Sequence, residues 1–170
     1  MEDKILESIA YILPATVTGF VAYYMFNGFI KQKNNEKKLD LLAQKNKDSL
    51  PVKLQAYERM LLFCDRINPV KMLMRVRPNS ENKNDYLTLL LANIEQEFEH
   101  NLVQQIYISD EAWKATMTSK NIIINKLKQI AENSNSANDL RENVLIDYSK
   151  SISPTETAIA IIKNEVKQLL

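Results

Sequence analysis

The placement of glycine constrains this chain more than any other feature of its sequence. Both glycines, Gly19 and Gly28, fall within the first 30 residues, so residues 31–170 contain none. Most turns with a positive φ angle require glycine, and a β-rich domain of this length depends on such turns. The sequence therefore predicts an all-α fold whose helices are joined by short connections of Asn, Ser and Pro.

About five helices are expected between residues 49 and 170, because capping residues recur just before apolar stripes with helical spacing. Proline soon after a capping residue is a specific start signal, since its missing N–H is not needed in the first helical turn. The expected starts are Asp48 or Ser49 with Pro51, Asn68-Pro69, Asp85, Ser109-Asp110, and the capping box Ser153-Pro154-Thr155-Glu156, with one more helix around residues 140–148.

Residues 8–30, SIAYILPATVTGFVAYYMFNGFI, contain no charged side chain. A helix of this length spans roughly 34 Å, which exceeds the roughly 30 Å of a hydrocarbon core. Acidic residues outnumber the single lysine in residues 1–7, whereas a signal peptide starts with basic residues. The sequence predicts one transmembrane helix here, preceded by a short acidic flank.

Lysines dominate the juxtamembrane segment, residues 31–48. Because positive flanks stay in the cytoplasm, we expect the N-terminus outside and residues 49–170 to form a cytoplasmic helical domain. The lysines also suit contact with anionic lipid of the inner leaflet, although a role in setting the topology alone explains them equally well. The candidate lipid-proximal residues are Lys31, Lys33, Lys37 and Lys38.

Small side chains line one face of the expected transmembrane helix. Ala15, Thr18, Gly19 and Ala22 lie at helical spacing and would let another helix approach closely. They predict a packing face for a partner or for a second copy of the chain. Ordinary contact with lipid is the alternative, since small residues are common in membrane helices.

The chain lacks the residues that common catalytic and metal sites require. A di-iron bundle site needs two Glu-x-x-His motifs, and a catalytic zinc site needs three protein ligands, but His100 is the only histidine. Cys64 falls on an apolar stripe, and no glycine-rich phosphate loop is present in residues 31–170. We therefore expect no cofactor, metal, catalytic residue or small-molecule substrate, and the nearly neutral charge of residues 48–170 argues against nucleic acid.

The end of the long helix after Asp85 carries a candidate interaction seam of polar residues. On a straight helix, Asn101 and Gln105 continue the apolar side that holds Phe98, so the two amides would enter the core or an interface. Alternatively, the apolar face rotates to Leu102 and Ile106 and leaves the amides at the rim. The candidate seam comprises Glu97, His100, Asn101, Gln104 and Gln105.

Two stretches, RINPVKMLMR (residues 66–75) and EFEHNLVQQIYIS (residues 97–109) with Trp113 after it, resemble an uncharacterised bacterial family of small, N-terminally membrane-anchored helical proteins. The resemblance covers most of the chain. It implies a membrane-tethered helical domain, and it brings no reaction and no catalytic residue. The residues that carry it are Arg66, Asn68, Pro69, Arg75, Glu97, His100, Asn101, Gln104, Gln105 and Trp113.

Together, these features predict an interaction or scaffold protein, such as an accessory subunit of an inner-membrane envelope complex. Its expected partners are membrane lipid and another protein or a second copy of the chain. Two alternatives stay open: a membrane-associated enzyme that uses carboxylates or a partner's residues, and a peripheral lipid-binding regulator.

Overall fold

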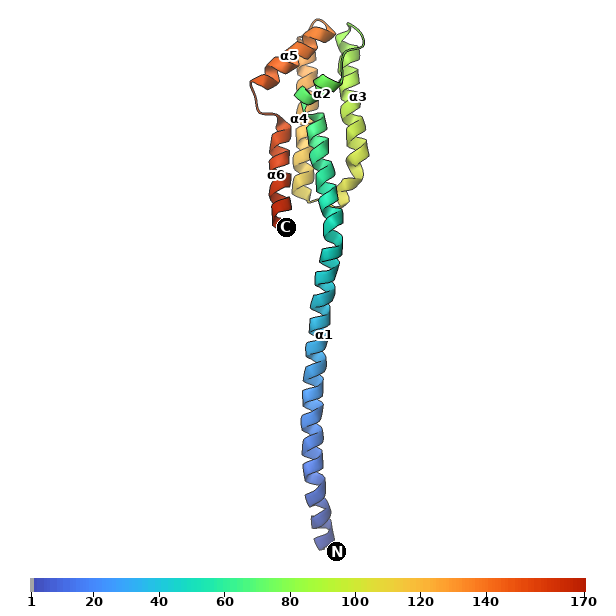
Figure 1. Ribbon diagram of the computed structural model, residues 1–170, viewed down its shortest axis with the longest axis vertical. Coiled ribbons are helices and arrows are strands. Elements are labelled where there is room, and N and C mark those ends of the chain that lie inside the picture. Colours follow the sequence, from blue (N-terminus) through green and yellow to red (C-terminus); the bar gives the residue numbers. More distant parts are fainter. Residues whose placement is uncertain (1) are drawn as a thin grey trace. The chain divides into compact units, whose positions relative to one another are not determined.

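The computed structural model describes the backbone of residues 2–170 and the side chains of residue 14, residues 16–45 and residues 47–170. Over this range it contains six α-helices, one 3₁₀ helix and no strand (Figure 1), which confirms the all-α prediction. The chain divides into two compact units, Met1–Ser49 and Leu50–Leu170. The helices are α1 (Glu2–Ile67), α2 (Pro69–Arg75), α3 (Lys83–Asn101), η1 (Leu102–Ile106), α4 (Asp110–Glu132), α5 (Ala137–Ser149) and α6 (Pro154–Leu169).

Local capping signals define several of these starts. The Asn68 side chain accepts the N–H of Lys71 and begins α2, and the Ser109 hydroxyl accepts the N–H of Ala112 and begins α4. Helix α6 begins at Pro154 as predicted. The predicted capping box is not formed, however, because the Ser153 hydroxyl is bonded to the Thr155 hydroxyl instead.

The predicted helix start at Pro51 is wrong, because α1 continues through this proline without a break in its helical backbone. A proline inside a helix removes one backbone hydrogen bond. The carbonyl left without that donor belongs to Lys47, an exposed residue, so water can reach it. Helix α1 therefore supplies both the N-terminal unit and the first helical segment of the second unit.

The described part of the chain includes no helix with both the length and the apolar character that crossing a membrane requires. The side chains of residues 8–13 and of Ala15, which belong to the predicted span, lie outside the described residues. The described part of the predicted span contains the polar side chains of Tyr23, Tyr24 and Asn27. It is followed directly by the charged Lys31. The predicted transmembrane helix is thus not supported by this structure.

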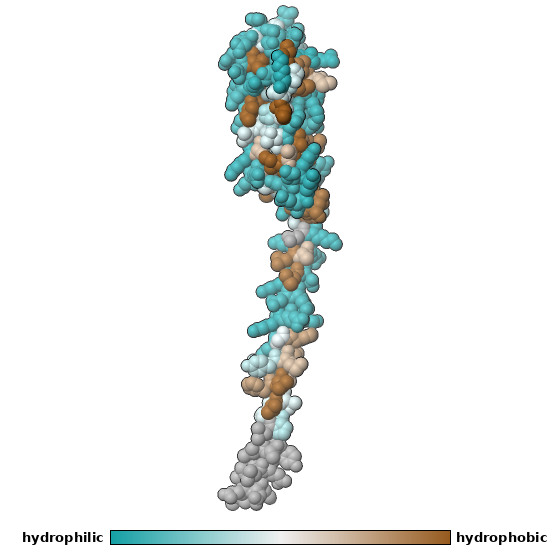
Figure 2. All heavy atoms as spheres, turned by 90° about the vertical axis from the view of Figure 1, so that its left-hand side faces the viewer, coloured by the Kyte–Doolittle hydropathy of each residue, from teal (hydrophilic) through white to brown (hydrophobic). Residues whose placement is uncertain are grey.

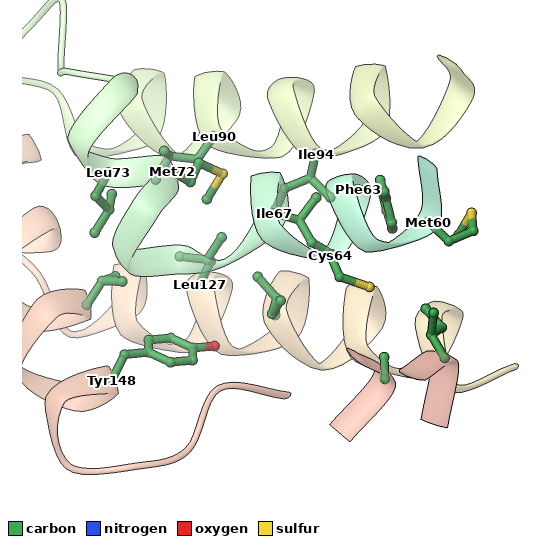
Figure 3. Close-up of a cluster of buried hydrophobic side chains, with 14 of the residues drawn as sticks. Met60, Phe63, Cys64, Ile67, Met72, Leu73, Leu90, Ile94, Leu127 and Tyr148 are labelled. Atoms are coloured by element: carbon green, nitrogen blue, oxygen red, sulfur yellow. The ribbon is translucent and has the colours of Figure 1, made fainter. Parts of the chain in front are cut away.

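The second unit has a single apolar core to which every helix except η1 contributes. Figure 3 shows part of this core, where side chains of α1 and α3 meet those of α4. Helix α4 packs against α3, α5 and α6, while α2 and α5 pack together near one end of the unit (Figure 1). The largest fully buried side chains include Met60, Phe63 and Ile67 of α1, Tyr86, Leu90 and Ile94 of α3, and Ile123 and Leu127 of α4.

Candidate functional site

A groove on the surface of the second unit runs between α1 and the end of α3. Its volume is about 460 Å³, which falls within the range of small-ligand and peptide sites. We call it the α1–α3 groove. Its lining residues are Gln55, Glu58, Arg59, Leu62, Phe63 and Arg66 of α1 with Glu97, His100 and Asn101 of α3.

The helical register of α1 produces one wall of this groove. Arg59, Leu62 and Arg66 recur at intervals of three and four residues, so they share one exposed face. The opposite face carries Met60 and Cys64, which are fully buried in the core. The groove is therefore a consequence of how the apolar face of α1 packs.

An ion pair ties the two walls together. The Nη1 atom of Arg66 donates to both carboxylate oxygens of Glu97, at 2.9 and 3.1 Å. The backbone carbonyl of Arg66 accepts from Arg75 at 2.7 Å, and the Asn101 amide donates to the Glu97 carbonyl at 2.7 Å. Glu97 is therefore the ion-pair partner of Arg66 in this structure.

Other charged groups in the groove have no partner of this kind. Among the described residues, Glu58, Arg59 and His100 make no ion pair or side-chain hydrogen bond, and all three are exposed. The groove thus offers charges of both signs next to the half-exposed side chain of Leu62. Such a surface suits recognition of a partner with complementary charges.

The structure separates the candidate seam into two parts. Glu97, His100 and Asn101 line the α1–α3 groove. Gln104 and Gln105 lie beyond the end of α3 in η1, and Gln105 is exposed. The helix expected to run straight through Gln105 ends at Asn101, whose side-chain amide donates to the carbonyl of Glu97 four residues earlier.

The alternative, in which the apolar face rotates to Leu102 and Ile106 and leaves the amides at the rim, holds only for the amides. Gln105 is exposed and Asn101 is half-buried, but the core does not cover Leu102 and Ile106. Their exposed fractions are 40% and 71%, and η1 has no buried residue. Val103 and Tyr107 are exposed as well, at 60% and 42%. We call these four side chains the η1 corner. The sequence signal for it was the run LVQQIY, which holds four large apolar residues but fits no single face of an α-helix.

No group of metal-ligating side chains occurs among the described residues. Cys64 is fully buried, and desolvation raises the pKa of its thiol to about 11, while a hydrogen bond with Thr116 opposes the shift. A thiol in this state is a poor nucleophile.

The remaining sequence-predicted residues lie on α1 in the N-terminal unit. Thr18, Gly19 and Ala22 are exposed, and no side chain approaches the position of a Cβ atom at Gly19, whereas the side chain of Ala15 lies outside the described residues. Lysines 31, 33, 37 and 38 are also exposed, and the ammonium of Lys33 lies 5.7 Å from the ring centroid of Phe29.

A family of unknown function, DUF7935, matches residues 3–169 of the chain. The chain belongs to this family. No curated protein and no solved structure matches it significantly. Membership of DUF7935 confirms the resemblance to an uncharacterised family, and because the match covers both compact units, the N-terminal helix is part of the family pattern together with the helical domain.

Proposed function

We propose that the second unit is a protein-interaction module and that the η1 corner and the adjoining α1–α3 groove form its docking surface. The observation that carries this proposal is the exposure of four large apolar side chains within six residues. Contiguous apolar patches on soluble domains mark sites of interaction with proteins, ligands or membranes.

The groove supports this function because it adds charged and hydrogen-bonding side chains to the apolar η1 corner. The Arg66–Glu97 ion pair holds the walls in place, and Arg59 and His100 remain available for a partner. Apolar anchors surrounded by polar groups are typical of interfaces with a few dominant contacts. An enzyme that uses carboxylates is less well supported, since Glu97 is already engaged by Arg66.

We further propose that the N-terminal unit holds this module at the inner membrane of a bacterium, with the N-terminus outside. Figure 2 shows uncovered apolar side chains on this part of α1, followed by a hydrophilic stretch. Phe20, Met25 and Phe26 are 65–71% exposed, and the Thr18 hydroxyl donates to the carbonyl of Pro14, so this polar group is satisfied within the helix. Exposed apolar side chains and an internally bonded hydroxyl both suit the hydrocarbon core of a membrane.

In this proposal the protein acts as a scaffold or accessory subunit of an envelope complex. The small-residue face with Thr18, Gly19 and Ala22 would contact a second membrane helix, from a partner or from another copy of the chain. The lysines at 31, 33, 37 and 38 would lie near anionic lipid of the inner leaflet.

Site-specific photo-crosslinking in native cells tests the docking surface. A photoreactive residue at Val103 should form a discrete crosslink that the same residue at Ile152 does not form. Ile152 is a fair control because it is 77% exposed in the same unit but lies in another connection. Ile106→Asp should abolish the Val103 crosslink, and identical products from both positions would refute the proposed surface.

A further inference from the structure

The η1 corner lies between acidic residues of the two helices that flank it. Glu99 belongs to the last turn of α3, and Asp110 and Glu111 belong to the first turn of α4. All three are exposed, and none forms an ion pair among the described residues. Lys114 is one helical turn after Asp110, but no ion pair joins them.

Helix electrostatics explain the positions of only two of these three acidic residues. Asp110 and Glu111 stabilise the N-terminal end of α4, where negative charge interacts favourably with the helix dipole. Glu99 lies at the C-terminal end of α3, where negative charge is unfavourable. Glu97 in the same region is compensated by Arg66, but Glu99 has no such compensation. Its position is therefore not explained by the stability of α3.

The chemistry of the corner disfavours one class of partner and favours another. Four exposed apolar side chains favour an apolar counterpart, and the carboxylates that flank them in the sequence disfavour an anionic lipid surface. A segment that carries apolar residues together with lysine or arginine complements both features. An amphipathic helix meets this requirement, since it can present apolar and basic residues side by side.

We propose that the η1 corner binds a basic amphipathic helix of a partner protein, with apolar residues on Val103 and Ile106 and cationic residues against Glu99, Asp110 and Glu111. This inference rests on the proposed function and specifies the chemistry of its partner. The exposed fractions of Val103 and Ile106 are 60% and 71%, so both side chains are accessible for such contacts.

A matched pair of probes tests the charge requirement. The full chain in neutral-lipid nanodiscs is titrated into a fluorescent synthetic amphipathic helix of leucine and lysine, and into the same helix with glutamate in place of lysine. Empty discs measure binding of either probe to lipid alone. The lysine helix should bind the chain at least about tenfold more tightly than the glutamate helix at low salt, and the difference should shrink at high salt.

Variants then locate the binding. Ile106→Ser, and separately the pair Glu99→Gln and Glu111→Gln, should each weaken binding of the lysine helix by about tenfold. The controls Ile152→Ser and Glu142→Gln replace exposed residues elsewhere in the unit and should leave binding of the lysine helix unchanged. Equal losses in the controls would overturn the proposal.

Three further outcomes separate this inference from the proposed function. If both helices bind equally and Ile106→Ser still weakens them, the η1 corner is a docking surface, but the requirement for a basic partner is refuted. If the chain self-associates through the corner, as judged by an Ile106→Ser variant that is monomeric, the occupant is a second copy and the inference is refuted. If neither helix binds, the inference also fails, while the crosslink at Val103 remains the independent test of the docking surface.

Discussion

At the scale of single residues, Glu165 connects three helices. One carboxylate oxygen accepts the hydroxyl of Tyr57 in α1 at 2.7 Å, and the other accepts the hydroxyl of Ser109, the cap of α4. The N–H of Ser109 in turn donates to the Tyr57 oxygen at 3.2 Å. Burial and the neighbouring carboxylate raise the pKa of Tyr57, so its hydroxyl remains a hydrogen-bond donor at neutral pH.

Replacing Tyr57 by phenylalanine should destabilise the second unit. The change removes one donor from Glu165 and one acceptor from the Ser109 N–H, so we expect a loss of about 1 to 2 kcal/mol in the free energy of unfolding. Urea unfolding followed by the fluorescence of Trp113 would measure it. Tyr107→Phe is the matched control, because Tyr107 is 42% exposed, and its effect should stay within about 0.5 kcal/mol. Equal stabilities of the two variants would contradict the role assigned to Tyr57.

At the scale of elements, α3 and α4 are joined by a buried lysine. The Lys120 side chain is only 10% exposed, and its ammonium lies 2.9 and 2.7 Å from the two carboxylate oxygens of Glu95. The same ammonium lies 4.1 Å from the ring centroid of Phe98, whose ring is tilted against Trp113 at 5.9 Å. The carboxylate and the aromatic ring together compensate for the removal of the ammonium from water.

The variant Glu95→Gln should reveal the cost of leaving this ammonium without its counter-charge. We expect a loss of about 1 to 2 kcal/mol, since one partner of a mostly buried pair is removed while Glu95 itself is partly solvated. Adding Lys120→Met should recover part of the loss, because it removes the stranded charge at similar side-chain volume. Unfolding free energies of the two single variants and the double variant provide the measurement. A double variant that is less stable than Glu95→Gln would show that the pair is not coupled in this way.

At the scale of the whole molecule, charge is distributed unevenly along the sequence. Residues 31–47 contain six lysines against Glu36 and Asp40, whereas residues 48–170 contain 15 basic and 16 acidic residues. Under the proposed function, the local excess of lysine sets the orientation of the N-terminal segment. The nearly neutral second unit then depends on local features such as the η1 corner, rather than on its net charge, to select a partner.

A reporter fused after Leu170 should be active only on the cytoplasmic side of the membrane. The expectation follows from the lysines after residue 30, which resist translocation. Protease protection of membrane vesicles and paired reporters specific for each side would measure the orientation. Replacing Lys31, Lys33, Lys37 and Lys38 by glutamine should reduce the bias between the two orientations. A signal from the external reporter in the unmodified chain would refute the proposed topology.

Features that depend on residues close together in the sequence could be predicted from it. The absence of glycine from residues 31–170 indicated an all-helical fold, and Asn68, Ser109 and Pro154 marked helix starts that the structure confirms. Such signals are reliable because a capping side chain satisfies backbone N–H groups only two or three residues away. The five-residue candidate seam was selected from its spacing on one helix. Glu97, His100 and Asn101 do line one groove, whereas Gln104 and Gln105 lie beyond the end of α3.

Only the tertiary structure decided how far each helix continues and which faces remain exposed. Pro51 was expected to start a helix but lies within α1, and α3 was expected to continue through Gln105 but ends at Asn101. Helical periodicity describes a regular helix and therefore fails where α3 gives way to η1. Arg66 and Glu97 are 31 positions apart, so their pairing depends on how α1 and α3 pack. The exposure of Ile106 has the same origin: the sequence sets its apolar character, and packing leaves it uncovered.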